Sequence, residues 1–202
     1  MLDAARLEHG EVTIRKAMHK GQYRYPRNMA FGGMQATWSN RLLHEVCATH
    51  LAAATTGTLI DLHSGLGPYG YGELMTPSLP GETVYELFYD WFGDEVHSTL
   101  AGNSNYAGSR GSILAGFRPK GEFERWAAVG VEFGTRERSQ VTAAVRADHW
   151  LHVNGDLDSE VGIEIKRRIR DAFYVEEDAW KEKVWARGLE VTTTALDRVV
   201  NS

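Results

Sequence analysis

The sequence predicts an α/β fold, in which a partial mixed or parallel sheet is flanked by helices. Two apolar, β-branched runs indicate the sheet, because residues 58–63 and 127–133 are bounded by glycine and polar residues, as buried strands usually are. Longer amphipathic patterns before, between and after these runs indicate the helices. With 202 residues, the chain is long enough to form one domain with a hydrophobic core of its own.

Amphipathic patterns predict helices over residues 3–20, 41–54, 82–92, 137–152, 159–173 and 177–187. Ser39 or Asn40 is the expected N-cap of the second helix, because a short polar side chain there can accept a hydrogen bond from the first turn. The tail over residues 191–202 is expected to be frayed or only weakly helical. No linker or internal repeat divides the chain, so residues 1–202 are expected to form one domain.

Two strands are few for an α/β sheet. Either weaker strands lie within the segments that read as loops, or part of the sheet comes from outside this chain. A sheet that lacks part of its strands exposes an unpaired edge and apolar surface, which predicts poor solubility or self-association when the chain is made alone.

Composition excludes several classes of protein. The net charge is −5 and no long basic run is present, which argues against a nucleic-acid partner. No stretch approaches the length and hydropathy of a membrane span. The single cysteine, Cys47, excludes an intramolecular disulfide and a cysteine-based zinc cluster. These features agree with a cytoplasmic location.

The first candidate site residues lie at the end of the strand predicted over residues 58–63. Asp61 and His63 are two residues apart, so both side chains emerge on the same face of a strand. A glycine-rich stretch follows, and α/β enzymes commonly build their sites where a strand ends in such a loop. Taken alone, however, a histidine at a strand end is more often a hydrogen-bonded structural residue than a metal ligand.

The second candidate, Glu132, lies near the end of the apolar strand over residues 127–133. A carboxylate in that position must be paired, hydrogen-bonded or bound to a metal, because burying it alone is costly. If the two strands are parallel neighbours, His63 and Glu132 face one cleft at the carboxyl edge of the sheet. A histidine ligand and a glutamate base are what zinc-assisted hydrolysis requires.

Four further residues are weaker candidates. Arg110 lies in a stretch rich in glycine, serine and asparagine, where it can contact an anionic substrate, and Arg146 can pair with a carboxylate. His149 and His152 are three residues apart on a predicted helix, a spacing that can bind metal. The simpler interpretation places these two histidines on the solvent side of the helix.

Several segments together resemble one branch of the zinc carboxypeptidase superfamily, a branch catalogued mostly as a domain of unknown function. They are GQYRYP, FGG with WSN, DLHSGLGPYGYGE, VEFGT, RADHWLHVNGDLDS and RIRDAFY. Members of this superfamily include metallocarboxypeptidases, aspartoacylase and succinylglutamate desuccinylase. The resemblance covers about residues 10–187 and is to the C-terminal half of the family's domain. It therefore implies a phosphorylase/hydrolase-like carboxypeptidase fold that lacks its N-terminal part.

The resemblance implies that His63 is the third ligand of a zinc ion and that Glu132 is the general base and later proton donor. Asp61 has no assured role in the family pattern and is a candidate for orienting a neighbouring group. The first two zinc ligands of the family belong to an upstream His-x-x-Glu pair, and no histidine of this chain has a glutamate three residues on. Two of the three expected ligands are thus missing.

The function expected from these observations is zinc-dependent hydrolysis of a peptide or amide bond, in the manner of a carboxypeptidase or an N-acyl-amino-acid deacylase. A small peptide or an acylated amino acid is the implied substrate. Because ligands are missing, the chain is expected to be a truncation, one half of a split enzyme that pairs with an N-terminal half-domain, or a remnant without catalysis. The last alternative makes it a binding or oligomerisation module.

Overall fold

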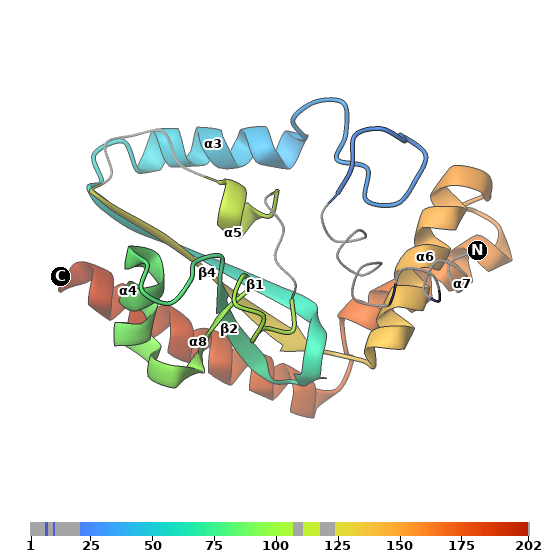
Figure 1. Cartoon of the computed structure of the whole chain (residues 1–202). Helices are drawn as coiled ribbons and strands as arrows, with labels where there is room; N and C mark the ends of the chain where they lie inside the picture. The colour runs from blue at the N-terminus through green and yellow to red at the C-terminus, as the bar shows by residue number, and fades with distance from the viewer. Residues whose placement is uncertain (1–6, 8–9, 11–20, 107–110, 118–123, 202) are drawn as a thin grey trace.

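The protein forms a mixed α/β structure, seen in a computed structural model that describes residues 7, 10, 21–106, 111–117 and 124–201 (Figure 1). Its four-stranded sheet has the order β1-β4-β2-β3, with bounds Thr56–Tyr69 for β1, Gly72–Thr76 for β2, Val96–Ser98 for β3 and Arg125–Gly134 for β4. β1 is parallel to β4, β2 is antiparallel to β4, and β3 is parallel to β2. The predicted fold class, a mixed sheet flanked by helices, is therefore confirmed.

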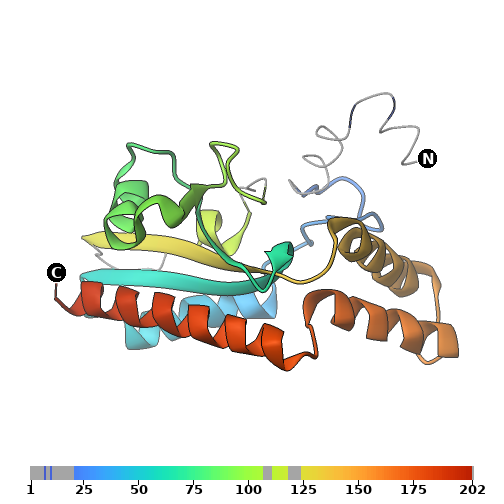
Figure 2. The same cartoon turned by 90° about the horizontal axis from the view of Figure 1, so that it is seen from below.

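Helices surround this sheet, with bounds Trp38–His50 for α3, Thr83–Phe92 for α4, Ile113–Gly116 for α5, Arg138–Asn154 for α6, Glu160–Phe173 for α7 and Asp178–Val200 for α8. A short 3₁₀ helix, η1, spans Gly93–Glu95. In Figure 1, α3 and α5 lie on the opposite side of the sheet from α8, and α6 and α7 lie beyond one end of it. Figure 2 shows α8 running along the sheet. The helix predicted over residues 3–20 falls almost entirely outside the described residues.

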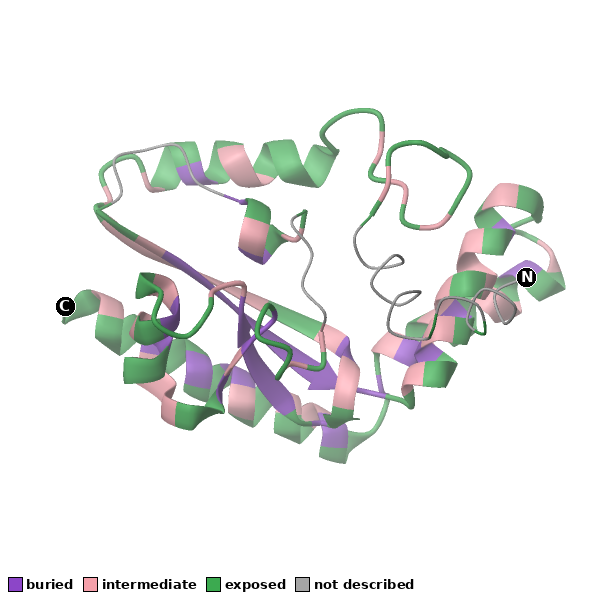
Figure 3. Ribbon diagram, viewed as in Figure 1, coloured by how far each residue is buried: buried purple, intermediate pink, exposed green. Residues whose placement is uncertain are grey.

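The strand β4 lies inside the sheet, and its side chains alternate between two different environments. Val129, Val131 and Phe133 are buried in the main core with residues of α4 and α8. Ala128 faces the other way, into a smaller cluster with Met75 and with Leu114 of α5. Glu132 shares the face of Ala128, because alternate residues of a strand point to the same side. Figure 3 shows the buried residues concentrated on β4 and β2.

Two expectations about helix ends are corrected by the structure. The N-cap of α3 is Thr37 rather than Ser39 or Asn40, and its hydroxyl accepts a hydrogen bond from the Asn40 N–H at 3.3 Å. The expectation of a frayed tail over residues 191–202 is also wrong, because α8 continues to Val200. Val191 and Ala195 are buried, so packing holds this last part of the helix in place.

The pairing of β1 with β4 is interrupted near its end. Ser64 is the partner of Phe133 and Tyr69 is the partner of Gly134, so residues 65–68 of β1 have no counterpart on β4 and bulge out of the ladder. Gly65 and Gly67 have φ values of 142° and 103°, which side chains other than glycine rarely adopt. Glycines at these positions allow the chain to leave the sheet and return to it.

β1 is also an edge strand. β4 lies on one side of it, and within the described residues no strand pairs with its other side. Leu62 of this strand is 56% exposed. The two additional strands, β2 and β3, thus lie on the far side of β4 and leave the outer edge of β1 unpaired.

Candidate active site at the carboxyl ends of β1 and β4

His63 and Glu132 are direct partners across the parallel pair β1 and β4. Paired residues of neighbouring strands point to the same face of a sheet, so the imidazole and the carboxylate lie side by side near the carboxyl ends of the two strands. The parallel arrangement predicted for these strands is confirmed, and it brings together the two residues predicted for the site.

Glu132 is almost fully buried, with 3% of its surface exposed. Its Oε1 accepts a hydrogen bond from the backbone N–H of Leu66, in the bulge of β1, at 2.8 Å. Burial raises the pKa of Glu132, while the Leu66 N–H and the nearby His63 imidazole act in the opposite direction. A carboxylate that holds its proton more tightly than usual is a stronger base once it is ionised.

His63 is more exposed than Glu132 and lies near two acidic groups. Its Nδ1 is 3.7 Å from Oδ2 of Asp61, which precedes it by two residues on the same face of β1. The Asp61 carboxylate raises the pKa of His63, partial burial lowers it, and the charge of Glu132 raises it further. Asp61 therefore lies beside the imidazole, on the strand face that the two-residue spacing predicted.

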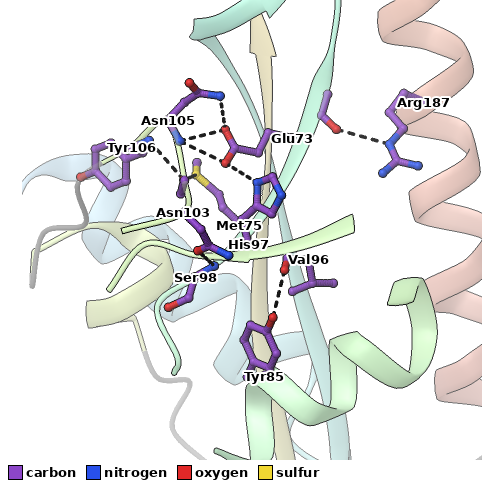
Figure 4. Close-up of polar contacts among 12 residues, drawn as sticks. Glu73, Met75, Tyr85, Val96, His97, Ser98, Asn103, Asn105, Tyr106 and Arg187 are labelled. Atoms are coloured by element: carbon purple, nitrogen blue, oxygen red, sulfur yellow. Dashed lines mark hydrogen bonds and ion pairs between the residues drawn. The ribbon is translucent and has the colours of Figure 1, made fainter. Parts of the chain in front are cut away.

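A buried carboxylate that the sequence analysis missed, Glu73, lies on the other side of Glu132. It is the partner of Glu132 across the antiparallel pair β2 and β4, and it is completely buried. Figure 4 shows its contacts with His97 and Asn105. Nδ1 of His97 lies 2.8 Å from Oε1 of Glu73, and Nδ2 of Asn105 donates to Oε2 at 2.8 Å. The backbone N–H of Asn105 also donates to this carboxylate, at 3.1 and 3.2 Å.

His63, Glu132 and Glu73 therefore form one row across three strands. In the sequence, Glu73 looks like the end of a glycine-rich loop rather than the start of a buried strand. Its hydrogen-bonding partners, His97 and Asn105, are 24 and 32 residues away along the chain. No local pattern connects them, so only the sheet order reveals the cluster.

The bulge beside Glu132 is fastened by contacts from the segment that ends α7 and from the end of β4. The Ser64 hydroxyl donates to the Phe173 carbonyl at 2.7 Å. The buried Thr135 hydroxyl lies 2.6 Å from the Ala172 carbonyl and 3.3 Å from that of Gly65. The Phe173 ring packs so closely on Gly65 that a Cβ atom there would come within 2.7 Å of it. These contacts hold the Leu66 N–H in place over Glu132.

The described residues do not by themselves complete a zinc site. Within the ranges that the structure describes, no group of three or more histidine, cysteine, aspartate or glutamate side chains has the geometry to hold a metal ion. His63 remains the one residue that the resemblance assigns as a ligand. A zinc ion at this edge therefore requires additional ligands from outside the described residues.

The weaker candidates do not join this row. Arg110 lies outside the described residues. Arg146 is exposed on α6, and no hydrogen bond or ion pair links it to another residue in the described part of the chain. His149 makes a 3.1 Å contact with the Arg27 carbonyl, and His152 lies near Asp148 and Lys166. His152 is exposed, whereas His149 is half-buried against the segment that contains Arg27, so neither histidine belongs to the row.

Comparison with known proteins identifies a family but not an activity. A family model described as "Protein of unknown function (DUF2817)" matches residues 1–187. No curated protein and no solved structure matches the chain. Among the described residues, every helix is too short or too polar to cross a membrane. Because the family model covers most of the sequence, the chain belongs to the DUF2817 family of proteins of unknown function.

Proposed function

We propose that this protein contributes the base-bearing half of a metal-dependent hydrolase site that cleaves peptide or amide bonds. The pairing of His63 with Glu132 across parallel strands is the observation that carries the proposal. In this proposal the imidazole serves as a nitrogen ligand and the carboxylate as a base, the two groups that hydrolysis of an unreactive carbonyl requires. The substrate class is a small peptide or an acylated amino acid.

Glu132 is the residue to which we assign proton transfer. Its carboxylate takes a proton from the attacking water and later delivers it to the departing amine, so that it ends in its starting state. Burial raises its pKa, which favours this double role. The Leu66 N–H holds Oε1 of this carboxylate, and we assign the contact with the water to Oε2.

Zinc is the metal that the family resemblance implies, and His63 is its candidate ligand. When bound beside Glu132, such an ion polarises a carbonyl and acidifies water. Because the described residues supply no group of three ligands, we assign no reaction step to the ion itself. The remaining ligands would come from undescribed residues of this chain or from a second polypeptide.

The decisive experiment is Glu132→Gln in the complete protein, assayed on a panel of dipeptides and N-acyl amino acids with zinc supplied. Removing a general base typically lowers the rate about 10²- to 10⁴-fold. We expect turnover to fall by that amount while the zinc content, measured by mass spectrometry, stays unchanged. The matched control is Glu190→Gln, which removes an exposed glutamate from α8. Equal activity of Glu132→Gln and Glu190→Gln would refute the assignment.

A second candidate function is a non-catalytic binding or oligomerisation module, and the unpaired outer edge of β1 favours it. Among the described residues β1 is an edge strand with an exposed Leu62, and such a strand is able to pair with another chain. This alternative predicts self-association or capture of an N-terminal half-domain, without stoichiometric zinc and without turnover. Sedimentation velocity of the chain and of Leu62→Lys tests it, because a charge on the edge should weaken strand pairing.

A further inference from the structure

A pocket of about 460 Å³ lies next to Glu132, at the end of β1 and β4. Residues 65–69 form one wall, residues 135–138 form another, and Asn105 contributes between them. The first wall includes Leu66, whose N–H donates to Glu132. A small molecule in this pocket would thus contact the same bulge that holds the candidate base.

The charged groups of this pocket favour an anion. Arg136 and Arg138 both line it, whereas Glu137 is the one acidic residue among the described residues of its lining. Arg138, the first residue of α6, is partly buried, and no acidic side chain in the described ranges forms an ion pair with it. Arg136 makes one long contact, 3.5 Å from Nη1 to Oε1 of Glu177. A partly buried guanidinium without a carboxylate partner attracts an anion, although the chain as a whole has a charge of −5.

Hydrogen bonds within the chain hold one of the arginines that line the pocket. Nη2 of Arg138 donates to the backbone carbonyl of Asn105 at 3.0 Å. Asn105 is in turn held by three hydrogen bonds to the buried Glu73 carboxylate. Because these contacts fix one end of the guanidinium, less side-chain entropy is lost when the rest of the guanidinium binds an anion. The buried Glu73 carboxylate therefore holds Asn105 in place, and Asn105 in turn holds Arg138.

We propose that this pocket is a binding site for a small molecule bearing a carboxylate or phosphate group, with Arg138 as the main contact and Arg136 as the second. Both groups present paired oxygens that match the fork of a guanidinium. The site is separate from the proton transfer assigned to Glu132, and binding of the anion does not depend on hydrolysis. Because the pocket lies beside Glu132, a substrate or regulator that binds near Glu132 would carry the anionic group.

The test is calorimetric titration of the full chain with sodium succinate and, separately, with inorganic phosphate, at low ionic strength. For a probe of this size we expect a Kd of roughly 1 mM. Tighter binding of succinate would assign the pocket to carboxylates, and tighter binding of phosphate would assign it to phosphate groups. Either result supports the anion site, whereas no heat of binding from either probe overturns it.

Variants distinguish the pocket from general charge attraction. We expect Arg138→Gln to weaken binding about 10-fold or more, and Arg136→Gln to weaken it by a smaller factor, because each charged contact is worth about one to two decades. The matched control, Arg198→Gln, removes the same charge from the end of α8, where Arg198 lies 3.4 Å from Asp90. Equal weakening by all three variants would overturn the proposal.

Two further variants keep the test decisive. Arg138→Lys retains the positive charge but lacks the planar guanidinium group, so we expect anion binding to weaken less than in Arg138→Gln. Circular dichroism should show that this variant folds as the parent protein does. Glu190→Gln, which removes an exposed glutamate of α8 that does not line the pocket, should leave succinate and phosphate binding unchanged within about twofold. The titrations measure binding and not turnover. Failure of the hydrolase proposal and failure of the anion site therefore give different results. Full affinity in Arg138→Lys together with Arg138→Gln would exclude Arg138 as the contact.

Discussion

Truncation of Asn105 tests whether the buried Glu73 carboxylate is held by its side-chain partners. In Asn105→Ala the 2.8 Å hydrogen bond from Nδ2 to Oε2 disappears, while the backbone N–H of residue 105 can still donate. A hydrogen bond to a charged group contributes about 1.5–3 kcal/mol, and a completely buried carboxylate has no water with which to replace it. We therefore expect the free energy of unfolding to fall by about 2 kcal/mol.

Urea unfolding followed by tryptophan fluorescence measures this loss directly, since the chain contains six tryptophans. In a domain of this size, the same loss lowers Tm by about 4–8 °C. Asn154→Ala is the matched control, because Asn154 is exposed at the end of α6 and its side chain donates to the Trp150 carbonyl, at 3.3 Å, and to no other described residue. That change should stay within about 0.5 kcal/mol. An equal effect of the two substitutions would refute the role of Asn105.

Three other predictions concern the same edge of the sheet. Glu132→Gln should stabilise the protein at neutral pH. Burial raises the pKa of Glu132 in the folded state, so the contribution of Glu132 to stability is fully present below its ordinary pKa of 4.5 and is lost as pH rises through the folded pKa. The difference in urea midpoint between Glu132→Gln and wild type should therefore widen from pH 4 to pH 8, and parallel curves would contradict it. Gly65→Ala should lower the free energy of unfolding by about 1–3 kcal/mol, because φ is 142° and the new Cβ would meet Phe173. The control Gly111→Ala has open space around the new Cβ, so it should have little effect on the thermal midpoint. Thr135→Val should cost about 1–3 kcal/mol in the same assay, since the hydroxyl is buried against the Ala172 carbonyl, and an unchanged midpoint would show that the bulge does not need it.

The pairing of His63 with Glu132 could be predicted because it depends on a local pattern and a general rule. Each strand is an apolar run of its own, and the carboxyl ends of parallel strands meet at one edge. The register of the two strands, which only the structure shows, then makes the two residues partners. Most helices were predictable for a similar reason, since their apolar faces follow a simple period.

The rest of the candidate site could not be read from the sequence. β2 and β3 are short, with five and three residues, and β2 directly follows a glycine-rich stretch that favours a loop interpretation. The buried position of Glu73 depends on hydrogen bonds with residues that are distant from it in the sequence. The extension of α8 was missed for a related cause: its last turns include three consecutive threonines, which favour helices weakly, and burial of Val191 overrides that preference.

The bulge of β1 shapes the pocket, whereas the paired part of β1 keeps His63 opposite Glu132. Residues 65–68 lie outside the ladder, and pairing up to Ser64 and Phe133 does not depend on their number. Relatives with longer or shorter bulges could therefore reshape the pocket while His63 and Glu132 stay opposite each other. Such an arrangement allows ligand preference to diverge by insertion and deletion, with the pairing of His63 and Glu132 left intact. Comparing bulge length with ligand preference across the family would show whether selection has used this freedom.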